Sequence, residues 1–152
     1  MIPKTLVITP TNHINGVNEI LESFAEVFYL EDPTVQELLE VVHLYDFIFT
    51  NPNKSKIFLN KDIIDAAINL KCICTASTGT NHIDKEYLKK NNIGLLSLTE
   101  ERETINKISS TAELAFALTL SAIRCIIPAS EDVKKGNWDY TKFIGRQMNS
   151  LN

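Results

Sequence analysis

The 152-residue chain is predicted to fold as an α/β protein built around one parallel sheet. Five short apolar runs occur before residue 99, and helix-patterned or polar segments separate them. This alternation is typical of parallel strands joined by helices that return the chain across the sheet. It favours a five-stranded, flavodoxin-like sheet with helices on both faces and ligands outside the carboxyl ends of the strands.

The expected strands are rich in β-branched and apolar residues and end at turn-forming residues. They are predicted at 6–9, 27–30, 46–50, 72–75 and 93–98. Helical spacing or capping residues predict the helices between them. These helices are expected at 17–24, after a capping box at Thr34–Glu37, at 61–68, and from the N-cap Asp84 to Lys90. The polar stretch 99–107 is expected to be a loop.

A long apolar helix is predicted beyond this sheet. A second capping box, Ser110–Glu113, precedes residues 114–123, which carry no charge. A helix that is apolar all round must be covered on every side, so we expect it inside the molecule or in an interface. Pro128 is expected to kink or break it, leaving 129–135 as an exposed second segment. The aromatic residues of the tail, Trp138, Tyr140 and Phe143, are expected to pack on another surface.

Composition limits the classes of partner. The net charge of −4 provides no strong positive field, so binding to nucleic acid or to an acidic membrane is not expected. Three cysteines without framework spacing favour a reducing compartment, and the start of the chain has no secretion-signal pattern. We therefore expect a soluble, cytoplasmic protein. Cys72 and Cys74 are interpreted as buried structural thiols on one strand face, and no metal site is predicted.

The main candidate for ligand binding is the small-residue loop after the fourth strand. Ser77, Thr78 and Gly79 can present several backbone N–H groups together, and a helix begins near Asp84. Such a loop and a helix N-terminus favour an anion, and Gly79 can adopt a positive φ. The alternative is an ordinary strand-to-helix turn that only needs small residues, and the local sequence supports both interpretations equally.

Two further side chains near these segments could contribute. His82 could act as a general base, although no carboxylate that would orient it is evident, so a solvated or capping role is favoured. Lys107 precedes the apolar helix and could pair with a carboxylate or phosphate, or be a surface lysine. Glu100, Glu101 and Glu103 are interpreted as a solvated loop.

Several nucleotide and hydrolase motifs are absent from the sequence. The five glycines stand at 16, 79, 94, 136 and 145, so neither G-x-G-x-x-G nor a P-loop is present. G-x-S-x-G and H-E-x-x-H are also missing. A phospho-receiver domain fits badly, because the first strand ends at Thr9-Pro10 without the acidic pair that Mg²⁺ needs.

Four segments together resemble a known family. TASTGTNHID, NIGLLSL, STAELAFALTLSAIR and KKGNWDYTKFIGRQMN follow in the order and spacing of the N-terminal part of the D-isomer-specific 2-hydroxyacid dehydrogenases, which include the phosphoglycerate dehydrogenases. The similarity is clear from about Leu70 to the end. It implies a flavodoxin-like substrate domain into which an NAD-binding domain of Rossmann type is inserted.

The resemblance also implies roles for individual residues. The backbone of Ser77, Thr78 and Gly79 would bind the substrate carboxylate. Thr78 and Thr111 would lie near the cofactor, and Lys107 falls where many members carry an asparagine that lines the site. None of the residues present is expected to be catalytic, because the family's catalytic arginine, glutamate and histidine lie further along.

The resemblance divides the chain in two. Residues 1–108 would be the substrate domain, and 109–152 a dimerisation helix and arm that lead to an absent NAD-binding domain. The chain stops at GRQMNSLN, before the family's glycine-rich turn, so a truncated or split dehydrogenase without activity of its own is expected. The implied parent reaction is NAD-dependent hydride transfer to or from a D-2-hydroxy or 2-oxo acid in a homodimer. The alternative is a non-catalytic dimerisation or carboxylate-binding module, which the downstream coding sequence would distinguish.

Overall fold

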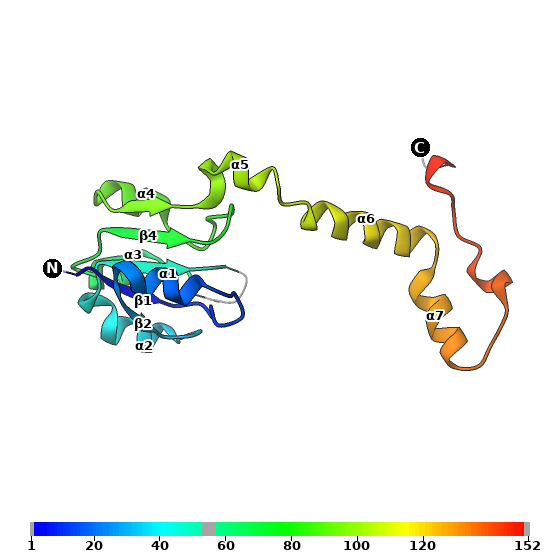
Figure 1. Cartoon of the computed structure of the whole chain (residues 1–152), viewed down its shortest axis with the longest axis horizontal. Helices are drawn as coiled ribbons and strands as arrows, with labels where there is room; N and C mark the ends of the chain where they lie inside the picture. The colour runs from blue at the N-terminus through cyan, green and yellow to red at the C-terminus, as the bar shows by residue number, and fades with distance from the viewer. Residues whose placement is uncertain (1, 53–56, 151–152) are drawn as a thin grey trace. The chain divides into compact units, whose positions relative to one another are not determined.

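A computed structural model describes residues 2–52 and 57–150. Five parallel strands form one sheet in the order β2-β1-β3-β4-β5 (Figure 1). The strands are β1 Lys4–Val7, β2 Glu26–Tyr29, β3 Phe47–Thr50, β4 Cys72–Thr75 and β5 Gly94–Leu96. This is the flavodoxin-like order that the sequence predicts. The predicted turn after β3 ends at Asn53, which lies outside the described residues.

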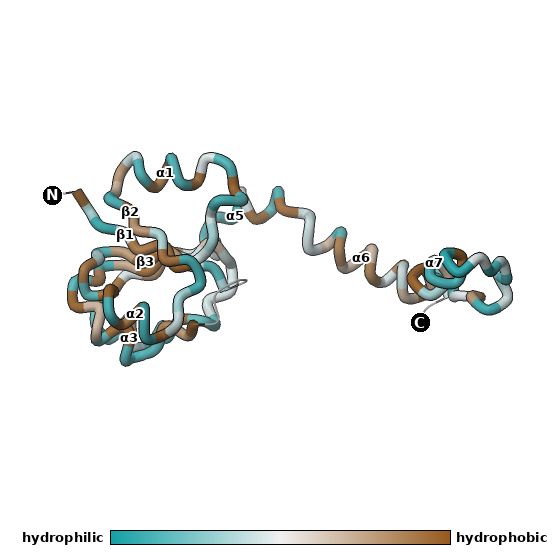
Figure 2. Tube along the Cα trace, turned by 90° about the horizontal axis from the view of Figure 1, so that it is seen from below, coloured by the Kyte–Doolittle hydropathy of each residue, from teal (hydrophilic) through white to brown (hydrophobic). Residues whose placement is uncertain are grey.

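Helices cover both faces of the sheet, also as predicted. They are α1 Val17–Phe24, α2 Val35–Val41, α3 Lys61–Ala66 and α4 Lys85–Lys90, with a 3₁₀ turn η1 at Val42–Leu44. Figure 2 shows α1 on one side of the strands and α2 and α3 on the other. Two of the three predicted helix caps are confirmed, because the Thr34–Glu37 capping box forms and the Asp84 carboxylate accepts from the Tyr87 N–H.

The main core lies on the face covered by α2, α3 and α4. Leu6, Ile48 and Ile73 are in register on three neighbouring strands, and each is fully buried. Leu38 of α2 and Leu88 of α4 belong to the same cluster. Because side chains alternate along a strand, this single row of apolar residues fixes the register of β1, β3 and β4.

The opposite face is less completely covered. Beside α1 it carries a cavity of about 310 Å³ whose walls include Phe24, Phe49, Cys74 and Leu96. Cys72 and Cys74 share this face, as predicted, but both are half-buried, because α1 alone does not cover the strand. Burial still raises the pKa of the Cys74 thiol to about 12, so the thiol stays protonated.

The predicted loop 99–107 is partly helical, which corrects that prediction. A 3₁₀ turn η2 occupies Leu98–Glu100 and a short helix α5 occupies Arg102–Ile105. The Ser97 hydroxyl accepts from the Thr99 N–H and caps the turn. The residues are polar because the turn is exposed, and their polarity therefore did not distinguish a helical turn from a loop.

The chain separates into two compact units, Met1–Arg102 and Glu103–Asn152. The second contains α6 Ser110–Ile123 and α7 Ile126–Lys134. The predicted box at Ser110 does not form: the N-cap is Ser109, whose hydroxyl donates to the Glu113 carboxylate. No residue of α6 is buried in the single chain, so of the two expected settings for this helix, inside the molecule or in an interface, only an interface remains as a prediction.

Pro128 breaks the predicted helix as expected, but the break lies at Arg124, four residues before the proline. Its ring would meet the carbonyl of Arg124, and it has no N–H for a helical bond there. The chain therefore ends α6 at Ile123, passes through Cys125 with φ 54°, and starts α7 with Pro128 in the first turn. No single described helix has the length and apolar composition to cross a membrane, although Arg102–Ile123 and Ile126–Lys134, bent by 64°, together meet those criteria.

The tail returns to α7 within the second unit, where only Phe143 of its three aromatic residues is partly buried. A cavity of about 220 Å³ has walls from Arg124, Asp132, Trp138 and Tyr140, together with Phe143 of the 3₁₀ turn η3 Tyr140–Phe143. Trp138 and Tyr140 remain 88% and 81% exposed, so the expected packing of these two residues is not met within the described chain. A last 3₁₀ turn, η4, occupies Met148–Ser150.

Candidate functional site

The candidate loop follows β4 at the carboxyl edge of the sheet. Thr50 and Thr75 end neighbouring strands in register, and the Ala76 N–H donates to the Thr50 carbonyl at 3.1 Å. The strands therefore hold the start of the loop where parallel α/β sheets bind their ligands. From there the chain crosses Ser77, Thr78 and Gly79 before it reaches α4.

Each carbonyl of the three loop residues accepts a hydrogen bond. The Leu98 N–H donates to Ser77 O at 3.1 Å, and the Thr99 hydroxyl donates to Thr78 O at 3.0 Å. The Ser77 hydroxyl donates to Gly79 O at 2.7 Å. Since η2 supplies two of these donors, the turn after β5 holds the loop in place.

The amide groups of the same residues are left unused. Within 2–52 and 57–150, the N–H groups of Ser77, Thr78 and Gly79 donate to no protein acceptor. Ser77 is half-buried, and Thr78 and Gly79 are exposed. The carbonyl groups of these consecutive residues are hydrogen-bonded and their N–H groups are not. Such N–H groups can bind an anion, for example a carboxylate.

Two expectations about this loop are corrected. Gly79 does not have a positive φ, and a Cβ placed on it would meet nothing within 4 Å, so neither backbone strain nor crowding requires a glycine. The N-terminus of α4 also provides no anion site, because the Asp84 carboxylate already occupies its first turn. The loop amides alone therefore supply the positive dipoles.

His82 is oriented by a hydroxyl and not by a carboxylate. Its Nε2 lies 3.2 Å from Thr75 Oγ1, and Thr75 Oγ1 lies 2.9 Å from Ser77 Oγ. Burial lowers the pKa of the ring, so it is neutral near pH 7. The sequence analysis did not identify Thr75 and Thr99, whose hydroxyl groups bond to the loop. The sequence indicates them only as a threonine directly before the loop and another after the fifth strand.

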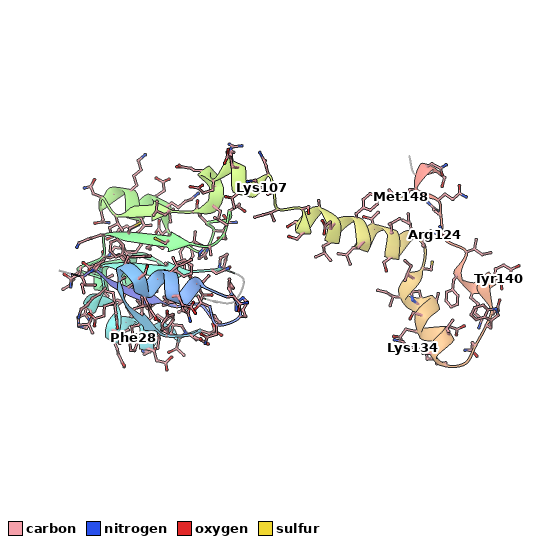
Figure 3. The ribbon with its side chains drawn as sticks, in the orientation of Figure 1. Phe28, Lys107, Arg124, Lys134, Tyr140 and Met148 are labelled. Carbon is pink, nitrogen blue, oxygen red and sulfur yellow. The ribbon has the colours of Figure 1, made fainter. Side chains whose placement is uncertain are left out.

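The other two expected site residues belong to the second unit. Lys107 and Thr111 are both exposed there, and Lys107 lies two residues after the end of α5 (Figure 3). The Lys107 N–H donates to Thr104 O at 3.1 Å, and its ammonium forms no ion pair with any residue in the described ranges. Their part in a site with the loop stays a prediction.

The described residues do not form a dinucleotide cradle. Such a cradle needs closely spaced glycines between the first strand and its helix. Here that segment, 8–16, contains one glycine, Gly16, which starts α1. This part of the chain therefore cannot hold a pyrophosphate in that way.

Comparison with known proteins identifies the family. The sequence model described as "D-isomer specific 2-hydroxyacid dehydrogenase, catalytic domain" matches residues 6–135. The chain belongs to the D-isomer specific 2-hydroxyacid dehydrogenase family. The match confirms the resemblance carried by the four sequence segments.

Relatives from this dehydrogenase family are longer than the chain. A D-3-phosphoglycerate dehydrogenase of Archaeoglobus fulgidus is 31% identical over 145 residues, which cover 95% of this chain and 26% of that protein. A glyoxylate reductase of Thermococcus litoralis is also 31% identical, with coverages of 91% and 40%. The chain thus spans about a quarter of the first relative and less than half of the second.

Two solved oxidoreductase structures share the fold. One is a D-lactate dehydrogenase from Aquifex aeolicus, complexed with NAD and lactic acid. The match covers 97% of this chain and 42% of the dehydrogenase chain, with a TM-score of 0.79 and 21% identity. An acyclic imino acid reductase in complex with NADPH and D-Arg also matches. The match covers 95% of this chain and 45% of the reductase chain, with a TM-score of 0.76 and 24% identity.

Proposed function

We propose that this chain is the substrate-domain portion of an NAD-dependent oxidoreductase that acts on the CH–OH group of a D-2-hydroxy acid. Family membership supports this reaction class, and the relatives include proteins named D-3-phosphoglycerate dehydrogenase and glyoxylate reductase. The similar fold crystallised with NAD and lactic acid supports NAD as the cofactor. The cofactor would supply the hydride, and this chain would bind and orient the acid.

The observation that carries the proposal is the arrangement of the loop after β4. Ser77, Thr78 and Gly79 have tethered carbonyls and unused N–H groups at the ligand-binding edge of the sheet. We assign the substrate carboxylate to these N–H groups. Thr78 would also approach the nicotinamide end of the cofactor. Because no catalytic acid or base is assigned within the chain, we expect no dehydrogenase activity from it alone.

The roles of the second unit follow from the same proposal. Lys107 would bind the polar group of the substrate, and Thr111 would contact the cofactor. Residues 1–108 would act as the substrate domain, and 109–152 as a dimerisation helix and arm leading to an NAD-binding domain. The three unpaired cysteines support a reducing, cytoplasmic setting for the protein.

A second candidate function rests on the apolar surface of α6 and the tail. Leu114, Phe116 and Leu118 are each more than half exposed on α6. Exposed apolar area of this kind marks an interface, which we assign to a homodimer. If no NAD-binding domain accompanies the chain, it would be a non-catalytic dimerisation or carboxylate-binding module. An in-frame G-x-G-x-x-G downstream would favour the enzyme.

Isothermal titration with pyruvate and glyoxylate tests carboxylate binding by the loop. The wild-type chain is expected to bind both acids, and Thr78→Pro, which deletes one loop N–H, is expected to lose most of that binding. Ile68→Ala, at an exposed position beyond α3, serves as the matched control and retains it. Equal binding by Thr78→Pro, with circular dichroism unchanged, would contradict the assignment of the carboxylate to these amides.

A further inference from the structure

The hydrogen bonds around Thr75 form a continuous chain from His82 to the loop. Thr75 ends β4 and is 5% exposed. Its hydroxyl lies 3.2 Å from His82 Nε2 and 2.9 Å from Ser77 Oγ, and Ser77 Oγ lies 2.7 Å from Gly79 O. Four groups from the strand, the loop and the following turn are thus connected in series.

The direction of each bond follows from counting protons. Gly79 O can only accept, so the single hydroxyl proton of Ser77 goes to it. Thr75 must then donate its own proton to Ser77 Oγ. With the Thr75 proton committed, its contact with His82 can only be donated by Nε2–H. The neutral ring is therefore the Nε2–H tautomer, and its buried Nδ1 carries a lone pair without a partner among the described residues.

We propose that His82 is a positioning residue that fixes the carboxylate-binding loop by donating its Nε2–H to Thr75. The inference rests on the proposed function of that loop. Through Thr75 and Ser77, this donation keeps the Gly79 carbonyl bonded to the Ser77 hydroxyl, while the three loop N–H groups have no protein acceptor among the described residues. A loop ordered before the ligand arrives loses less conformational freedom on binding, which raises affinity without a new contact.

His82 is itself held by the main chain. Its carbonyl accepts from the Leu59 N–H at 2.9 Å, and the Asp84 N–H donates to Leu59 O at 3.0 Å. Ile83 between them is buried and bridges to Leu59. The His82 ring is thus attached to a segment that the core holds in place. In the chain of hydrogen bonds from His82 to Gly79, the His82 end is therefore the rigid one.

This assignment separates His82 from a general base. In the neutral ring, Nε2 carries the proton that Thr75 accepts, and Nδ1 is buried, so neither nitrogen is available to take a proton from a substrate. The ligand class is unchanged: a small 2-oxo or 2-hydroxy carboxylate. What His82 provides is the geometry of the amides that bind it.

Three variants of the 152-residue chain test the role. His82→Leu removes the donor, His82→Gln places an amide N–H near the same point, and Thr75→Val removes the acceptor. Pyruvate affinity is expected to fall about three- to tenfold in His82→Leu and in Thr75→Val, the effect of one lost hydrogen bond. His82→Gln restores most of the affinity. The double variant His82→Leu/Thr75→Val loses no more than either single one, because both break the same connection.

Nuclear magnetic resonance of the free chain provides a readout that does not depend on binding. The ring nitrogens of His82 are expected to report the Nε2–H tautomer, and amide order parameters of residues 77–79 are expected to fall in His82→Leu. An Nδ1–H tautomer, unchanged loop order in His82→Leu, or additive losses in the double variant would overturn the positioning role. A wild-type chain that binds no pyruvate would instead overturn the proposed function on which it rests.

Discussion

Thr75 Oγ1 and His82 Nε2 lie 3.2 Å apart, and this contact connects the last residue of β4 to the turn before α4. The strand end and the turn are both fixed by the sheet and by the Leu59–Ile83 bridge. The loop between them is therefore held at both ends and by the hydrogen bonds of the Ser77 hydroxyl. The N–H groups of residues 77–79 have no acceptor among the described residues. In the proposed site, the arrangement of the three N–H groups is therefore a consequence of how the loop is attached.

The burial of His82 predicts how stability depends on pH. Burial lowers the pKa of the ring below its ordinary value of 6.5, so between the two values the unfolded chain binds more protons than the folded chain. Stability therefore rises with pH across that window, and it falls as the pH drops from 6.5 towards the folded pKa. Urea unfolding from pH 5 to 8 is expected to show a flatter dependence for His82→Gln. Identical slopes for the two proteins would exclude this assignment.

The row of fully buried residues across the sheet predicts a large effect of truncation. Ile73 pairs with Ile48 and is fully buried, so Ile73→Ala removes methyl groups from a packed site and leaves a cavity. The expected loss is about 2–5 kcal/mol in the free energy of unfolding.

Ile68→Ala is the matched control, because Ile68 is 77% exposed. It is expected to change stability by no more than about 0.5 kcal/mol. Chemical denaturation of both variants checks the pair, and similar losses at the two positions would contradict the proposed core.

The backbone around Gly145, in the second unit, leaves no room for a larger residue. A Cβ there would collide with the Ile123 carbonyl and lie 2.8 Å from Arg124 Cα, where the Arg146 N–H donates to Ile123 O at 2.8 Å. Gly145→Ala is therefore expected to detach the tail from the end of α6 and to speed proteolysis after Gly136. Gly79→Ala, where a Cβ meets open space, should leave the digestion pattern unchanged. A resistant Gly145→Ala tail would show that the backbone can shift there.

The exposed apolar surface of α6 predicts self-association. Leu118 is 59% exposed and Leu120 is half-buried on a helix without charges from 114 to 123. Sedimentation of the wild-type chain is expected to give a dimer, and Leu118→Lys with Leu120→Glu is expected to give a monomer, because charges would be buried in the interface. Ile68→Lys, exposed in the first unit, should remain dimeric. A folded wild-type monomer would remove the dimer role from α6.

The sequence predicted the sheet because each strand alternates with a helix and each apolar run is bounded by turn residues. It located Val17–Phe24 and Lys85–Lys90 correctly, since apolar spacing indicates the first helix and the Asp84 cap indicates the start of the second. It missed α5, which is polar because it is exposed, and it placed the helix break at Pro128 when the steric conflict acts at Arg124.

The candidate loop was also evident from its small residues, but its attachment was not. Thr75 and Thr99 reach the loop only because β4 and η2 bring them beside it. The two settings expected for α6, inside the molecule or in an interface, could not be distinguished from the sequence for a related reason. An apolar pattern indicates that a surface must be covered, but it does not identify what covers it.

The most direct test of the central claim is a residue-resolved amide titration of the ¹⁵N-labelled chain with pyruvate, with chloride at equal ionic strength as the reference. The account predicts that the largest shifts occur at the N–H groups of Ser77, Thr78 and Gly79, and that chloride does not reproduce them. Shifts confined to other residues, or equal responses to pyruvate and chloride, would contradict the assignment of this loop as the site that binds the substrate carboxylate.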